Sequence, residues 1–297
     1  MKNAPFRHRL EMIGYRAVQA FLKRLSPEGV RRFGRRLGGW AYRLVPSLRR
    51  RSLDNLALVM GERSLAERRQ IARGSLRHLA AALCEALAIE RRVLPQLDRW
   101  VDLAGLSHLD EAVGADPSRG VFLMTGHFGP WEIAAHALSK RFGGIDFVAR
   151  PPDNPYLAAE ILRLRERFGS RVIAKKGAAF GILRSIRTGR NVGILIDQRV
   201  RPSAGMLLPF FGRPAWTSPI LAQLSIRTGA PVVPLFCQPL PGGRYELRFE
   251  PAIHPPAAAA RGEEAYAALT LRYLAVLEDE IRKTPELWLW AHRRWKT

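Results

Sequence analysis

A histidine and a glutamate in a short glycine-flanked turn are the residues of this chain whose types and spacing best suit chemistry. His127 lies between Gly126 and Gly129, directly after the apolar run 121–124, and Glu132 follows it by five positions. A neutral imidazole takes a proton from a hydroxyl near pH 7, and a carboxylate on its other nitrogen stabilises the imidazolium. We therefore expect His127 and Glu132 to be catalytic, as general base and supporting carboxylate, without a protein nucleophile.

The turn itself is expected at the edge of a sheet. The apolar run before it is typical of a strand buried on both faces of a parallel sheet, which places His127 at the rim where such sheets bind ligands. Pro130 then opens a helix. Gly126 and Gly129 would let a substrate approach the backbone closely. A structural interpretation is equally open, in which Glu132 caps the helix and His127 is a satisfied rim histidine.

Further candidate substrate-binding residues also follow expected strands. Because the carboxyl ends of parallel strands meet at one edge, we expect several of them to converge near His127. Cations there would hold a phosphate or an anionic headgroup, and the aspartate would orient one of the cations or a loop. Each of them, taken alone, also fits a plain surface role. These residues are Arg150, Lys175, Asp197 and Gln198.

The alternation of apolar runs and amphipathic segments after residue 98 predicts an α/β fold, a mainly parallel central sheet flanked by helices. We expect residues 1–98 to form an N-terminal helical, membrane-associating region and residues 99–297 the α/β domain, or the two to form one continuous globular unit. The expected strands are 101–103, 121–124, 145–149, a short one near 172, 192–196, 232–236 and 245–249. The expected helices are 106–113, 131–141, 155–168, 218–227 and 263–282.

Composition limits the possible classes of protein. With 297 residues, 47% of them hydrophobic, the chain is long enough for a sizeable core. Cys84 and Cys237 lack metal-ligand spacing, so we expect two buried thiols, no metal and no disulfide framework. No apolar run approaches the roughly 18 residues that suggest a transmembrane helix.

The N-terminal region is strongly basic. Residues 1–63 hold 15 Lys or Arg against four Asp or Glu, which is half of the net charge of +22. Two segments, 10–25 and 27–44, carry apolar stripes at helical spacing beside arginines, and Ser26 is a suitable N-cap for the second. Basic amphipathic helices of this kind suit an anionic membrane surface. Packing onto a core with a solvated basic face, or nucleic-acid binding, are the alternatives.

Six sequence blocks together resemble the bacterial lipid A biosynthesis lauroyl/myristoyl acyltransferase family. The resemblance covers roughly residues 10 to 296. The blocks are Arg51-Ser-Leu-Asp-Asn-Leu56, Gly126-His-Phe-Gly-Pro-Trp-Glu132, Ala149-Arg-Pro-Pro-Asp-Asn-Pro155, Ile196-Asp-Gln198, Phe210-Phe-Gly212 and Trp288-Leu-Trp-Ala-His-Arg-Arg-Trp-Lys296.

This resemblance implies a glycerol-phosphate acyltransferase-like fold and a shared motif, a histidine and an acid separated by four residues, at His127 and Glu132. It implies transfer of a fatty acyl chain from a thioester carrier to a hydroxyl of a membrane glycolipid, without a covalent acyl-enzyme. Arg150 would hold an acceptor phosphate, and Arg293 is a weaker candidate for the same task.

Several details remain open at this stage. We expect no cofactor, with acyl carrier protein favoured over coenzyme A as the acyl carrier and a lipid A precursor favoured over a phosphatidylinositol mannoside as acceptor. We expect a monomer, without nucleic acid, peripheral on the cytoplasmic face of the bacterial inner membrane. The rival of a different class is a non-catalytic basic membrane- or nucleic-acid-binding protein.

Overall fold

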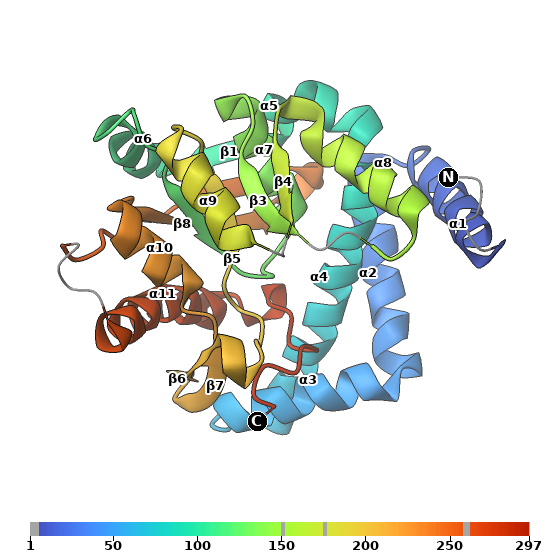
Figure 1. The fold of residues 1–297 in the computed structure, drawn as a ribbon. Helices are drawn as coiled ribbons and strands as arrows, with labels where there is room; N and C mark the ends of the chain where they lie inside the picture. The colour runs from blue at the N-terminus through green and yellow to red at the C-terminus, as the bar shows by residue number, and fades with distance from the viewer. Residues whose placement is uncertain (1–5, 150–151, 175–176, 258–261, 297) are drawn as a thin grey trace.

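A seven-stranded sheet forms the centre of the computed structural model, which describes residues 6–149, 152–174, 177–257 and 262–296 (Figure 1). The strand order is β1-β9-β8-β2-β5-β3-β4, and the described pairs are parallel except β8 with β9. The strands are β1 (Val101–Ala104), β2 (Phe122–Thr125), β3 (Asp146–Ala149), β4 (Arg171–Ala174), β5 (Val192–Leu195), β8 (Val232–Pro239) and β9 (Tyr245–Phe249). The expected α/β class with a mainly parallel sheet is confirmed.

Helices cover both faces of the sheet because alternate strand residues point to opposite sides. Leu123 packs with Ile133 and Leu138 of α7, whereas Phe122 packs with Ile182 of α9 and Leu221 of α10. The helices after the first strand are α6 (Leu106–Gly114), α7 (Trp131–Phe142), α8 (Pro155–Arg165), α9 (Ala178–Arg187), α10 (Ile220–Thr228) and α11 (Glu263–Lys283). Short 3₁₀ turns lie at Leu94–Gln96, Glu166–Phe168, Pro202–Ala204, Pro241–Gly243 and Pro285–Leu287.

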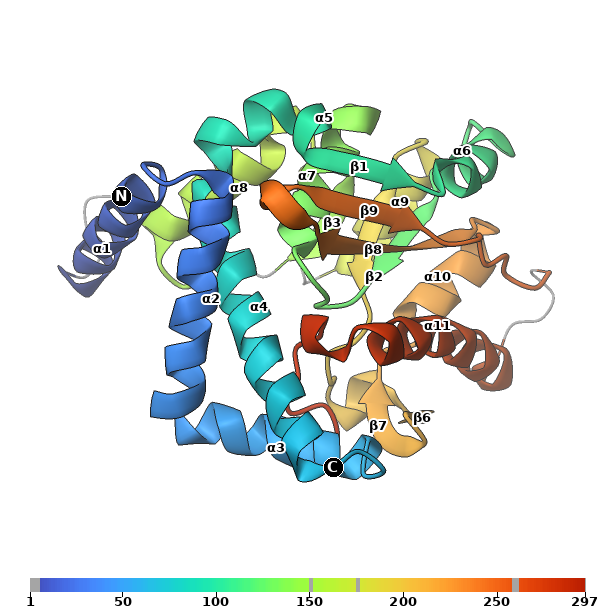
Figure 2. The same ribbon diagram turned by 180° about the vertical axis from the view of Figure 1, so that it is seen from behind.

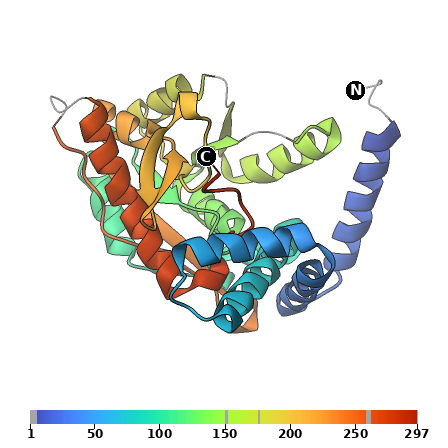
Figure 3. The ribbon, with the colours of Figure 1, turned by 90° about the horizontal axis from the view of Figure 1, so that it is seen from below.

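The N-terminal region is helical, as expected. It contains α1 (Phe6–Leu22), α2 (Pro27–Leu44), α3 (Pro46–Val59), α4 (Leu65–Arg92) and the short α5 (Leu97–Trp100). Ser26 caps α2, as the sequence predicts, and Ser64 with Glu67 forms the capping box of α4. Figure 2 shows α2 and α4 side by side, and Figure 3 shows α1 standing at the edge of the molecule.

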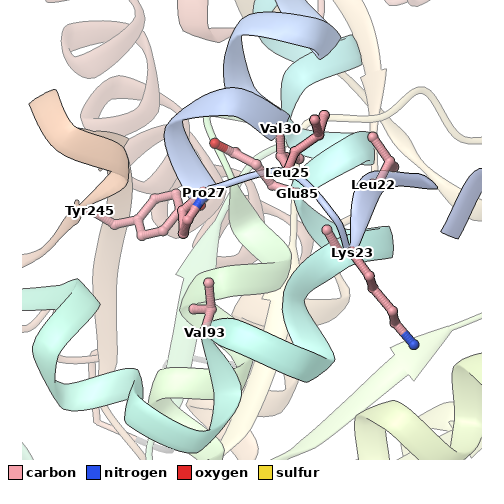
Figure 4. Close-up of a pocket in the computed structure, with 9 residues that line it drawn as sticks. Leu22, Lys23, Leu25, Pro27, Val30, Glu85, Val93 and Tyr245 are labelled. Atoms are coloured by element: carbon pink, nitrogen blue, oxygen red, sulfur yellow. The ribbon is translucent and has the colours of Figure 1, made fainter. Parts of the chain in front are cut away.

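A buried ion pair ties α2 to the rest of the fold. The Arg31 guanidinium donates to Glu85 of α4 at 2.7 Å and to the carbonyls of Leu240 and Arg244 near β9. Figure 4 shows Glu85 and Tyr245 beside the turn between α1 and α2. The pocket at this junction is only about 20 Å³, so it is a packing seam and too small for a lipid substrate.

One hydrophobic core joins the helical region to the α/β part. Leu56 and Met60 of the α3 end, with Ile71 of α4, pack in the same cluster as Phe122 and Phe236 of the sheet. The division at residue 98 stays a prediction. Both cysteines are buried and free, as the sequence predicts.

The elements expected from the sequence do not include α9 or the two-stranded hairpin of β6 (Met206–Phe210) and β7 (Arg213–Thr217). The hairpin loop, Phe211-Gly212, has positive φ at both residues, 53° and 68°. A two-residue hairpin loop with positive φ at both positions normally has the sequence Asn-Gly or Asp-Gly. Phe211 is held there because its amide donates to Glu278 at 2.7 Å and Arg282 lies over its ring.

Candidate active site

The turn 126–130, which holds His127, and the end of a neighbouring strand are brought together by the register of the sheet. β2 and β5 are parallel, with Thr125 opposite Leu195. His127 and Asp197 each lie two residues beyond these partners, so the fold places them side by side at the carboxyl edge of the sheet. The predicted convergence of polar residues at this rim is therefore confirmed for His127, Asp197 and Gln198.

The Asp197 carboxylate, which is 2% exposed, receives three hydrogen bonds. His127 Nδ1 lies 2.8 Å from Oδ1, the His127 amide donates to Oδ2 at 2.8 Å, and the indole of Trp288 donates to Oδ2 at 2.9 Å. Gln198 Nε2 lies 3.1 Å from His127 Nε2. Because a carboxylate only accepts, Nδ1 carries a proton and Nε2 of the neutral ring is the free base.

The directions in which the pKa values of His127 and Asp197 are shifted agree with this hydrogen bonding. Burial alone would lower the pKa of His127, but the adjacent Asp197 and, more weakly, Glu132 outweigh it and raise the pKa above 6.5. Burial alone would raise the pKa of Asp197, yet His127 and the donated hydrogen bonds lower it below its usual value. Asp197 is therefore ionised near neutral pH and favours the imidazolium that forms when His127 takes a proton.

The supporting carboxylate is not the one the sequence predicts. Glu132 lies on the first turn of α7 and pairs with Arg165 of α8, at 2.5 Å between Oε1 and Nη2. Asp197 occupies the position beside His127 Nδ1 that we assigned to Glu132, since the parallel register brings Asp197 closer than the helix brings Glu132. The expectation that Asp197 orients a cation or a loop stays a prediction, as does the catalytic role of Glu132.

A cavity of about 530 Å³ opens beside His127 and is lined mainly by apolar side chains. Its polar lining residues include His127, Glu132, Arg165 and Gln198, and the Trp131 ring contacts the His127 ring edge to face at 5.2 Å between centroids. Apolar side chains from the sheet and from α7 and α9 line the remainder, among them Leu123, Leu138, Ile145, Phe147, Ile182 and Leu235.

The two glycines of the turn are required by the protein itself. A Cβ on Gly126 would lie 3.2 Å from the Asp197 carboxylate, and one on Gly129, which has φ of 56°, would lie 2.0 Å from the Cys237 carbonyl oxygen. Packing within the protein explains both glycines, and their role in substrate approach stays a prediction. Gly126 makes room for Asp197, and Gly129 lets the turn pack on β8.

The C-terminal segment 287–295 packs against the turn that holds His127 and contacts Asp197. Trp288 pairs with Phe128 of the catalytic turn in a β-bridge, besides its bond to Asp197. Ser75 of α4 donates to the Trp288 carbonyl at 2.5 Å, and Asn55 of α3 donates to the carbonyls of Trp290 and His292 at 2.7 Å each. The helical region therefore fixes Trp288, which fixes Asp197.

The other site residues that the sequence predicts are Arg293, Arg150 and Lys175. Arg293 is exposed, whereas its neighbour Arg294 is fully buried and donates to the Trp216 carbonyl and the Thr217 hydroxyl. Arg150 and Lys175 lie outside the described residues. Across 6–149, 152–174, 177–257 and 262–296, no group of three or more His, Cys, Asp or Glu side chains could hold a metal ion.

Several known acyltransferases are similar to this chain. The lipid A biosynthesis lauroyltransferase of Escherichia coli K12 is 27% identical over 90% of this chain and 85% of its own length. The lipid A biosynthesis myristoyltransferase of the same organism is 29% identical over 68% and 62% of the two chains. A phosphatidylinositol mannoside acyltransferase of Mycobacterium tuberculosis is 31% identical over 50% and 46%. Residues 6–297 match the bacterial lipid A biosynthesis acyltransferase family, and the chain belongs to that family.

Proposed function

We propose that this chain transfers a fatty acyl group from an acyl thioester to a hydroxyl of a membrane glycolipid, with His127 as general base. The observation that carries the proposal is that His127, paired with Asp197, lines a mainly apolar cavity. The cavity suits a hydrocarbon chain, and the imidazole beside it suits the acceptor hydroxyl. Family membership supports the same reaction class.

The reaction proceeds in one complex without an acyl-enzyme. His127 Nε2 takes the hydroxyl proton while the acceptor oxygen attacks the thioester carbonyl. Asp197 stabilises the resulting imidazolium, and the Glu132–Arg165 pair lies further along the cavity wall. The carbon–sulfur bond then breaks, the ester remains on the acceptor, and the departing thiolate takes the proton back from His127.

Gln198 marks where the acceptor hydroxyl binds. Its amide nitrogen, which is a donor, occupies the hydrogen-bonding position of His127 Nε2 at 3.1 Å. An acceptor hydroxyl donating to Nε2 takes the same place, and the Gln198 side chain is exposed and free to turn aside. Arg150 stays our candidate for an acceptor phosphate.

We propose peripheral attachment to the cytoplasmic face of the bacterial inner membrane, and the exposed residues of α1 suit contact with a membrane surface. Its apolar residues Phe6, Leu10 and Ile13 are 74%, 51% and 63% exposed beside basic neighbours. Such a helix lies in the interface with its apolar face among the lipids. None of the described helices is both long and apolar enough to cross a membrane.

The acceptor and donor are identified by one experiment. Purified protein is incubated with a total lipid extract and either acyl carrier protein or coenzyme A bearing the same acyl chain, and products are identified by mass spectrometry. We expect an acylated lipid A precursor formed preferentially from the carrier protein; an acylated phosphatidylinositol mannoside would reassign the acceptor. The absence of any acylated lipid, or equal product from His127→Ala, contradicts the proposal.

A further inference from the structure

An arginine cluster on α2 and α4 has no anionic partner. Within the described part of the chain, none of its guanidinium groups forms a hydrogen bond or an ion pair. The cluster consists of Arg35, Arg36 and Arg43 of α2 with Arg69, Arg73 and Arg77 of α4.

Close packing of the two helices creates the cluster. Gly34 and Gly38 of α2 face the α4 backbone, where an added Cβ would lie 2.5 Å from the Cα of Ala81 or of Arg77. Without side chains at these glycines the helix backbones touch, and the arginines beside them come together. On α4, Arg69, Arg73 and Arg77 recur every four residues and so share one face.

Two adjoining hollows, of about 630 and 180 Å³, lie among these side chains, and Arg35, Arg73 and Arg77 line both. Tyr42 adds a hydroxyl to the larger hollow, and Glu286 is the carboxylate in its lining. The hollows are large enough for a phosphate with a small polar group, and planar guanidiniums bind phosphate oxygens in pairs.

Keeping the cluster without an anion is unfavourable. Burial, together with Arg35 and Arg73, lowers the pKa of Arg77. Arg77 Nε is buried and finds no hydrogen-bond partner among the described residues. Burial and the surrounding arginines also lower the pKa of His78, at the hollow, to about 4, so this ring is neutral at pH 7. Like charges four residues apart destabilise a helix, and an anion in the hollow would offset this.

Exposed apolar side chains beside the smaller hollow indicate which type of anion the arginine cluster binds. Trp40, which lines the smaller hollow, is 55% exposed, and Leu44 and Val45 beyond it are 78% and 38% exposed. An exposed indole and aliphatic side chains beside arginines match the boundary between lipid headgroups and acyl chains. The convex, polar surface of an acidic protein would leave these apolar side chains uncovered.

We propose that the arginine cluster binds the phosphate-bearing headgroup of an anionic membrane lipid, with Trp40 and Leu44 against its acyl chains. The inference deepens the proposed peripheral attachment and rests on it. It assigns a defined lipid site to α4 as well as α2, separate from the cavity at His127.

The test measures binding of monomeric dihexanoylphosphatidylglycerol, below its critical micelle concentration, to the full chain by calorimetric titration. Arg73→Gln/Arg77→Gln removes two cluster charges, and Arg227→Gln/Arg272→Gln removes two exposed arginines on α10 and α11 as the matched control. We expect roughly tenfold or greater weakening in the cluster variant and little change in the control. The melting temperature of the cluster variant without lipid should equal or exceed that of the wild type, because repulsion is relieved.

Three results would overturn the inference. Equal weakening in both variants would mean that binding follows net charge, and equal affinity for glycerol 3-phosphate would mean a site for soluble phosphates. Binding of acyl carrier protein that is lost in the cluster variant, while lipid binding is kept, would mean a protein partner. Because the lipid probe is monomeric, failure of the whole protein to adhere to vesicles is a separate result that tests only the peripheral attachment.

Discussion

His127 and Asp197 lie two residues beyond paired positions of adjacent parallel strands, and the carboxylate holds both the ring and the backbone amide of the histidine. The two hydrogen bonds fix the orientation and the tautomer of the imidazole together. A supporting carboxylate on the same strand-end rim is therefore more rigidly placed than one on the following helix.

The first prediction compares two isosteric substitutions. Asp197→Asn places an amide beside His127 Nδ1 and favours the tautomer with the proton on Nε2, so kcat should fall by roughly 10²- to 10⁴-fold. Glu132→Gln leaves the His127–Asp197 pair intact and should cost less. Steady-state kinetics with unchanged melting curves check this. A larger loss for Glu132→Gln would return the supporting role to Glu132.

A second prediction concerns pH. The general base must be neutral, so kcat/KM should rise with pH and reach its plateau only above the raised pKa of His127, higher than the ordinary 6.5. Asp197 raises this pKa most among the neighbours and Glu132 less, so the midpoint should move to lower pH slightly in Glu132→Gln and further in Asp197→Asn. Identical midpoints in the three proteins would show that the profile reports another group.

The same shift predicts how stability depends on pH. The folded protein binds the His127 proton more tightly than the unfolded chain, so protonated His127 stabilises the fold. This contribution is complete at pH values below the pKa of His127 in the unfolded chain, and it is lost as pH rises through the higher pKa of His127 in the folded protein. The free energy of unfolding of wild type relative to His127→Gln, measured by urea titration, should therefore decrease from pH 6 to pH 8. An increase over that range would contradict the assigned pKa direction.

A third prediction separates two costs of replacing a glycine that has a positive φ, namely the steric contact of the new methyl group and the strain in the backbone. Gly129→Ala combines a positive φ with a Cβ 2.0 Å from the Cys237 carbonyl oxygen, and should destabilise the protein by roughly 2 to 5 kcal/mol. Gly212→Ala has a similar φ, 68°, but open space around the new methyl group, and should cost about 1 kcal/mol. Denaturant unfolding measures both. Equal losses would show that the contact with β8 relaxes freely.

The fourth prediction tests the apolar cavity as the acyl site. Gly193 of β5 lines it, and a Cβ there would meet Ile145 and Phe147 only at ordinary distances of 3.7 and 3.8 Å. Gly193→Ala should therefore be tolerated, whereas Gly193→Val should lower kcat/KM for long relative to short acyl donors by about tenfold. An equal loss of kcat/KM for acyl donors of all chain lengths would show that the acyl chain does not occupy this cavity.

The sequence predicts well which residues share the edge of the sheet with His127, but it predicts poorly which carboxylate pairs with His127. Apolar strands ending in Gly126-His127 and Asp197-Gln198 identify residues that share one edge of the sheet. Which strands are neighbours is a property of the whole fold, and β2 lies beside β5, about 70 residues away in sequence. Spacing along the chain favours Glu132, because five residues is a short distance, but α7 carries Glu132 toward Arg165.

The hairpin and the arginine cluster both depend on contacts between segments that are far apart in the sequence, so neither follows from the local sequence pattern. Phe211-Gly212 adopts a turn that its residue types do not announce, and a contact from Glu278 on α11 holds it. The arginines on α2 were recognised as a basic face, but their meeting with those of α4 depends on where Gly34 and Gly38 let the helices cross. Long-range contacts decide both features.

The bond from Trp288 to Asp197 also has a consequence during protein synthesis. His127 and Asp197 leave the ribosome 161 and 91 residues before Trp288, so the nascent chain carries the acid and the base before the residue that completes their setting. A nascent or truncated chain that stops short of residue 288 lacks both the indole donor and the bridge to Phe128. The hydrogen bonding around His127 is therefore completed late in translation, after the N-terminal helices that we propose contact lipid have already emerged.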